Sequence, residues 1–202
     1  EFSKWVDMIN GEKPDMVLIA GDIIDRSVAP LLADDDAQEF RRISAPVFAC
    51  PGNHEYYSGI DNSKEFYKLA GITMLRDTAM CFEGINIIGR DDRTNLRRKP
   101  LQALVSETDG NKFTILLDHQ PYSLEEADKC GIDFEFCGHT HHGQVWPVSL
   151  ITDAIYEDAY GALEKGCTKY YVSSGIGIWG GKFRIGTRSE YIVAEVSRAQ
   201  GS

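Results

Sequence analysis

The sequence has 202 residues, 31 acidic and 21 basic, which gives a formal net charge of −10 at pH 7. This length and an apolar fraction of 43% suffice for one globular domain with a sizeable core, so we expect a single soluble domain over residues 1–202. The acidic balance argues against binding of nucleic acid or an anionic membrane through bulk charge, because such domains are usually basic. Apolar runs such as Met16–Ala20 are also far too short to span a bilayer.

The first half of the chain alternates between helix and strand patterns. Apolar residues at helical spacing predict a helix over 2–9, which Gly11 ends. The continuous apolar run Met16–Ala20, closed by Gly21, is typical of a strand buried on both faces. We then expect helical residues around 36–43, a short strand over 46–50 and a helix over 61–69.

The second half continues this alternation and ends on strands. We expect strands over 85–89, 113–117 and 133–137. Ser123 and Glu126 form the pattern of a capping box for a helix that Gly131 ends. Later strands are predicted over 169–172 and 191–196, on either side of a glycine-rich stretch. Strand–helix alternation followed by late strands predicts an α/β fold with mixed sheets.

The cysteines indicate no metal ribbon and no disulfide framework. There are five, at positions 50, 81, 130, 137 and 167, and none forms a C-x-x-C pair. Cys50 and Cys137 end apolar runs, where a cysteine is usually a small buried hydrophobe. This pattern favours a reducing, cytoplasmic compartment, although a membrane-anchored parent protein is compatible with it.

Four polar clusters each follow a predicted strand immediately. They are Gly21-Asp22-Ile23-Ile24-Asp25-Arg26, Gly52-Asn53-His54-Glu55, Asp118-His119 and Gly138-His139-Thr140-His141-His142. Taken singly, such a cluster is more often a turn or a hydrogen-bonded core histidine. Four of them can converge, because ligand sites of open α/β sheets form at the carboxyl ends of the strands. Carboxylate, amide and imidazole groups are ligands of Zn²⁺, Mn²⁺ or Fe²⁺, so the sequence predicts a metal site.

In order and approximate spacing, these four motifs resemble those of the calcineurin-like metallophosphoesterase superfamily. The continuation Gly143-Gln144-Val145-Trp146-Pro147 resembles a bacterial branch whose members often follow an amino-terminal membrane anchor. The resemblance covers nearly the whole chain. It implies an α/β fold of two facing mixed β-sheets flanked by helices.

The resemblance also implies a dinuclear centre of divalent ions (Mn, Fe or Zn). Asp22 would bridge both ions, and His141 would bind the first. The second would be completed by Asn53, His119 and His139. His54 would be a catalytic residue that contacts the phosphoryl group and stabilises the leaving oxygen, rather than a ligand.

Four further features have two interpretations each. Asp25 would orient a histidine or loop amide, or is a plain turn acid. Arg26 would contact the substrate phosphate, or is a solvated side chain. His142, where the branch commonly has a small residue, is a substrate contact at the pocket rim or a solvated loop residue. The basic run 97–99 is a solvated loop or contacts a phosphate.

One motif of the superfamily is missing from this chain. It is an Asp-x-His at the end of the first strand, upstream of the helix predicted over 2–9, and both of its residues would bind the first metal. Without it that metal keeps only Asp22 and His141, so the first site should be incomplete. Either the chain is a piece of a longer protein and lacks its N-terminal strand, or the departure is genuine and leaves a one-metal binder.

The function that the resemblance implies is that of a metal-dependent phosphoesterase. It would activate water for attack on a phosphate mono- or diester, which makes it a hydrolase of phosphoester bonds. The expected substrate is a small phosphate ester or a lipid-linked phosphate, and nucleic acid is disfavoured by the net charge. The alternative is a catalytically silent metal-binding or interaction module on the same fold. The natural substrate and the oligomeric state stay open.

Overall fold

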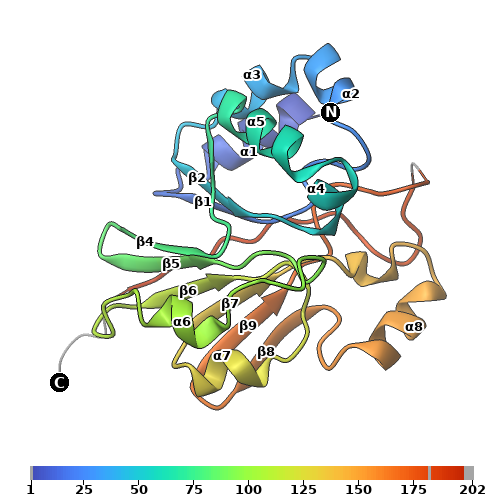
Figure 1. Ribbon diagram of the computed structural model, residues 1–202. Coiled ribbons are helices and arrows are strands. Elements are labelled where there is room, and N and C mark those ends of the chain that lie inside the picture. Colours follow the sequence, from blue (N-terminus) through green and yellow to red (C-terminus); the bar gives the residue numbers. More distant parts are fainter. Residues whose placement is uncertain (1, 182, 198–202) are drawn as a thin grey trace.

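The computed structural model describes residues 2–181 and 183–197. In these residues two β-sheets lie face to face, with helices on the outer side of each sheet (Figure 1). The expected α/β fold with two sheets flanked by helices is therefore confirmed.

The smaller sheet has the order β1-β2-β3 and is parallel throughout its described strands. Its strands are β1 (Val17–Ala20), β2 (Val47–Cys50) and β3 (Ile72–Met74). Helices α1 (Phe2–Gly11), α3 (Asp36–Arg41) and α5 (Ile60–Leu69) cover its outer face. The shorter helices α2 (Ala29–Ala33) and α4 (Asn53–Tyr57) follow β1 and β2 along the chain.

The larger sheet has the order β4-β5-β6-β7-β9-β8 and is mixed. Its central strands are parallel, whereas β4 and β8 pair antiparallel at the two edges. In chain order its strands are β4 (Thr78–Phe82), β5 (Ile85–Gly89), β6 (Thr114–Leu117), β7 (Phe134–Cys137), β8 (Gly161–Lys165) and β9 (Thr168–Val172). Helices α6 (Leu101–Val105) and α7 (Glu125–Lys129) pack on its outer face, and a short helical turn, η1 (His141–Gly143), leads into α8 (Val148–Ile155).

Alternation along the strands divides the core into layers. In β2, Val47 and Ala49 face the outer helices, while Phe48 and Cys50 face the other sheet. In β6, Leu117 faces the smaller sheet and Leu116 faces α6 and α7. Because successive side chains of a strand point to opposite faces, a strand in the middle of such a stack must be apolar on both faces. This is why β1, β2 and β6 are continuous apolar runs in the sequence.

Three expectations need correction. The predicted strand over 191–196 does not form: this segment pairs with no strand of the described residues, and Val193 and Val196 stay exposed. The predicted capping box does not form either: Ser123 has a φ of +57° and α7 begins later, at Glu125. A capping residue needs an extended backbone, which this conformation excludes. Of the two sheets, only the larger is mixed.

The expected burial of two cysteines is confirmed. All five cysteines are free, and Cys50 and Cys137 are buried as expected. Among the helices that the structure describes, none has the length and apolar content needed to cross a membrane.

Candidate metal centre

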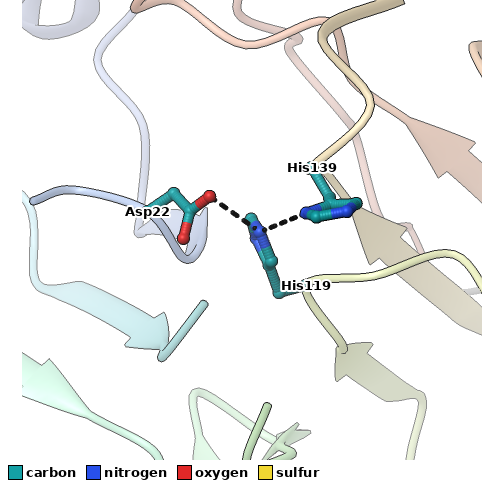
Figure 2. Close-up of side chains that lie close together, drawn as sticks. All are labelled: Asp22, His119 and His139. Carbon is teal, nitrogen blue, oxygen red and sulfur yellow. Dashed lines mark hydrogen bonds and ion pairs between the residues drawn. The ribbon is translucent and has the colours of Figure 1, made fainter. Parts of the chain in front are cut away.

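The side chains of the candidate site leave the carboxyl ends of four parallel strands, two from each sheet. Asp22 follows β1 and Asn53 follows β2, while His119 follows β6 and His139 follows β7. Figure 2 shows the side chains of Asp22, His119 and His139 pointing toward one another. One ligand atom from each of these three residues lies within 4.8 Å of the other two.

The imidazole of His119 is at the centre of this group. Its Nε2 atom lies 2.9 Å from Asp22 Oδ2, 3.1 Å from Asn53 Oδ1 and 3.2 Å from His139 Nδ1. Its other nitrogen, Nδ1, lies 2.5 Å from the carbonyl oxygen of Ala20. Because a carbonyl oxygen only accepts hydrogen bonds, Nδ1 carries a proton and donates it. Nε2 is therefore the atom that His119 can offer to a metal ion.

The charges of Asp22 and His119 depend on each other. Burial alone would raise the pKa of Asp22, but the adjacent His119 lowers it to about 2. Burial alone would lower the pKa of His119, but the Asp22 carboxylate and the Ala20 carbonyl raise it to about 9. Burial and the neighbouring His119 charge lower the pKa of His139 to about 4, so His139 is neutral at pH 7 and its lone pair is available.

The donor set fits a divalent transition-metal ion. A carboxylate oxygen, an amide oxygen and two imidazole nitrogens meet at one point, and each of them can give an electron pair. In the protein without metal, His119 Nε2 carries a proton and faces three acceptor atoms, which belong to Asp22, Asn53 and His139. A cation at the same position would satisfy all of them, and its binding would release that proton.

Two loops approach each other closely to form this group. Asp22 has a φ of +55° and His139 a φ of +69°, conformations that cost energy in residues other than glycine and often occur at functional sites. A Cβ atom on Gly21 would lie 2.6 Å from Gly52 N, and one on Gly52 would lie 2.2 Å from Asp22 Oδ1. Only glycine fits at these two positions, which lets the loops after β1 and β2 touch.

Glu55 joins the loops after β1 and β2 by accepting hydrogen bonds from their backbone N–H groups. Its side chain is fully buried, and Oε2 accepts hydrogen bonds from Gly52 N at 2.7 Å and Asp22 N at 2.9 Å. Its Oε1 accepts from Ile24 N at 3.1 Å. Burial and the charge of Asp22 raise the pKa of Glu55, while the bonds from Gly52 and Ile24 oppose that shift. Nothing in the letters of the second cluster predicts this supporting role of Glu55, although the residue stands inside that cluster.

His54 lies beside the group and contacts two parts of the first cluster. Its backbone N donates to Asp22 Oδ1 at 2.9 Å. Its ring Nδ1 donates to the carbonyl oxygen of Asp25 at 2.5 Å and lies 3.2 Å from the Asp25 carboxylate. Nδ1 thus carries a proton, and Nε2 is the ring atom left for another partner. Of the two interpretations of Asp25, these contacts favour a residue that orients a histidine.

His141 lies outside the group formed by Asp22, His119 and His139. Its Nδ1 is 3.5 Å from an Nη of Arg184, whose guanidinium also donates to the carbonyl oxygens of Ser174, Gly175 and Gly177. Burial and the charge of Arg184 lower the pKa of His141 to about 4, so the imidazole is neutral. Arg184 had no motif to mark it in the sequence; only the fold brings it to His141.

Arg26 and His142, the two tentative substrate contacts, point elsewhere. The Arg26 side chain is 81% exposed, and its nearest acid is Asp25, at 3.9 Å. The His142 ring stacks on Tyr160, with ring centroids 4.4 Å apart, and lies 3.9 Å from Asp153. Neither side chain contacts the Asp22 group in this arrangement.

A family model described as calcineurin-like phosphoesterase matches residues 1–143. The chain belongs to this family. It is 33% identical over 191 residues to an uncharacterized metallophosphoesterase of Helicobacter pylori strain J99, an alignment that covers 92% of this chain and 52% of that protein. The chain therefore spans about half the length of that relative. The resemblance read from the four motifs is confirmed.

Two more distant similarities agree with this calcineurin-like phosphoesterase assignment. The chain is 30% identical over 200 residues to a protein named phosphodiesterase YaeI of Escherichia coli K12, covering 92% of this chain and 71% of that protein. The crystal structure of a 5'-nucleotidase precursor from Thermus thermophilus superposes with a TM-score of 0.55 at 15% identity, covering 86% of this chain and 42% of that one. The second similarity supports the fold alone.

Proposed function

We propose that this chain is the catalytic domain of a phosphohydrolase that uses two divalent metal ions to hydrolyse a phosphate mono- or diester. The observation that carries the proposal is the convergence of Asp22, Asn53 and His139 on Nε2 of His119. Four electron-pair donors around one point, at the carboxyl ends of strands, are what a metal-dependent hydrolase of this family requires.

In this proposal Asp22, Asn53, His119 and His139 hold one ion. Oδ2 of Asp22 contacts His119 Nε2, whereas Oδ1 accepts a hydrogen bond from the backbone N of His54. The two carboxylate oxygens therefore have different neighbours. A second ion would be held by Asp22 and His141, the two residues of this chain to which the family resemblance gives that task. When bound, such ions polarise phosphoryl oxygens and lower the pKa of water from about 15.7 toward 7.

His54 is proposed to hold a proton for the leaving oxygen of the substrate. Its Nδ1 proton is retained by Asp25, so the ring is oriented and Nε2 is presented away from the loop. A proton on Nε2 of that ring can be given to an alkoxide as it leaves. Asp25 acts as a positioning residue, because it contacts His54 and not the substrate.

The proposal is tested by metal content and hydrolysis measured together. With Mn²⁺, we expect the protein to hydrolyse p-nitrophenyl phosphate or bis(p-nitrophenyl) phosphate. The measurement is made on this chain and on any longer parent that supplies residues before Glu1. Asp22→Ala and His139→Ala should each lower kcat/KM by about 100-fold or more, since each removes a ligand. Asp34→Ala removes an exposed carboxylate elsewhere and should leave the rate unchanged.

The outcomes separate the proposal from its rival, a silent metal-binding or interaction module. Two ions per chain by elemental analysis, together with hydrolysis, support the enzyme. One ion per chain in the longest available form, without hydrolysis of either ester, supports the silent module. If His139→Ala keeps both full metal content and full activity, the ligand assignment is wrong.

A further inference from the structure

A charged pocket that contains none of the candidate metal ligands lies between the segment that follows β5 and the start of α7. It has a volume of about 310 Å³ and is lined by four cationic side chains, those of Arg90, Arg93, Arg98 and Lys99. The single acid in its lining is Glu126, at the start of α7. Four cations around one pocket are unexpected in a chain whose net charge is −10. Three of the four cations form ion pairs: Arg90 with Asp118 and Glu126, Arg98 with Asp118, and Lys99 with Glu107. The fourth, Arg93, has no ion pair among the described residues, and an unneutralised guanidinium beside two partly used ones points to an anionic ligand.

The buried guanidinium of Arg90 and the partly buried one of Arg98 use only part of their donors. Nη1 of Arg90 donates to Asp118 at 3.2 Å and to Glu126 at 2.9 Å. Arg90 is 6% exposed, and its buried Nε has no hydrogen-bond partner in the described residues. Arg98 likewise donates through Nη1, to Asp118 and to the carbonyl oxygen of Asp91. A guanidinium carries five N–H groups, so both side chains retain donors for a ligand.

Arg93 supplies a cation that no acid of the described residues neutralises. Its guanidinium lies over the ring of Tyr122, 4.7 Å from the ring centroid, and makes no ion pair among those residues. Stacking on an aromatic ring orients a guanidinium without using its hydrogen-bond donors. Arg93, which is exposed, can therefore bind an anion at the open side of the pocket, while buried Arg90 and partly buried Arg98 line its inner side.

We propose that this pocket binds a phosphate group, either as inorganic phosphate or as the phosphoryl group of a small phosphorylated molecule. Planar guanidinium forks match the oxygens of phosphate in pairs, and such charge-assisted bonds are about twice as strong as neutral ones. A volume of about 310 Å³ is at the lower end of small-ligand pockets, so a long polymer does not fit inside it. The inference uses no residue of the Asp22 group and is independent of the proposed hydrolase activity.

The test is a calorimetric titration of the protein with inorganic phosphate and with glycerol 3-phosphate, before and after metal removal with a chelator. We expect saturable binding of one anion per chain that survives chelation. Arg93→Gln should weaken it about tenfold, which is the value of one hydrogen bond to a charged group. Arg97→Gln is the matched control, because it removes the same charge from an exposed neighbour that does not line the pocket. Arg97→Gln should bind like the unmodified protein.

The two anions distinguish the source of the phosphate. Tighter binding of glycerol 3-phosphate assigns the pocket to a phosphorylated small molecule, and equal or tighter binding of inorganic phosphate assigns it to the free ion. The proposal is overturned if the chelated protein shows no saturable binding of either anion. It is also overturned if Arg97→Gln weakens binding as much as Arg93→Gln, since bulk charge would then explain the attraction.

Discussion

Replacing Glu55 by glutamine tests how the loops after β1 and β2 are held. The carboxylate accepts three backbone N–H groups, from Gly52, Asp22 and Ile24, and is fully buried. The glutamine amide has only one oxygen. If that oxygen accepts from Gly52 N and Asp22 N, the NH₂ group faces Ile24 N, which is itself a donor. A lost bond to a charged acceptor and the weakening of the others should lower the free energy of unfolding by about 2–4 kcal/mol.

The measurement is urea unfolding of the metal-free protein at pH 7.5, compared with Glu65→Gln. Glu65 is exposed on α5, so that variant should stay within about 0.5 kcal/mol of the unmodified protein. Because Glu55 also fixes the backbone of Asp22, Glu55→Gln should weaken metal binding as well. A free energy of unfolding and a metal affinity both equal to those of Glu65→Gln would refute the role assigned to Glu55.

Two further predictions concern close contacts and buried charge. Gly52→Ala should lower the free energy of unfolding by about 1–3 kcal/mol and weaken metal binding, because its Cβ would lie 2.2 Å from Asp22 Oδ1. Gly110→Ala, with nothing within 4 Å, is the control, and equal urea midpoints would contradict the argument. Burial raises the pKa of Glu135 well above 4.5, and its Oε2 has no hydrogen-bond partner among the described residues. Since its folded pKa is the higher one, stability from this group is present below about pH 4.5 and is lost as pH rises through the folded pKa. Glu135→Gln should therefore raise the free energy of unfolding by about 1–3 kcal/mol at pH 8 and change it little near pH 4.5. The measurement is urea unfolding of both proteins at the two pH values, and a difference that does not depend on pH would contradict this reasoning.

Continuous apolar runs were the most informative part of the sequence for the fold. Strands β2 and β6 are fully buried on both faces, and β1 packs partly buried apolar side chains against both core layers, so hydrophobicity alone marks all three. Edge strands carry a weaker pattern: β8 alternates between half-buried and exposed residues, and the prediction missed it. The segment 191–196 shows the opposite error. Its apolar residues suit a strand, but a strand also needs a pairing partner, which the residue pattern of one segment does not reveal, and 191–196 pairs with none of the described strands.

Strand-end motifs predicted which residues gather at the site, but not where each one points. The second cluster shows why. Asn53, His54 and Glu55 are consecutive in the first turn of α4, where successive side chains are about 100° apart around the axis. Asn53 consequently meets His119, His54 meets Asp25, and Glu55 turns under the two loops. A motif read as a string of letters does not show that these three side chains point in different directions. The helical turn instead separates them: Glu55 supports the backbone that carries Asp22, and in the proposed function Asn53 would hold an ion and His54 would face the substrate.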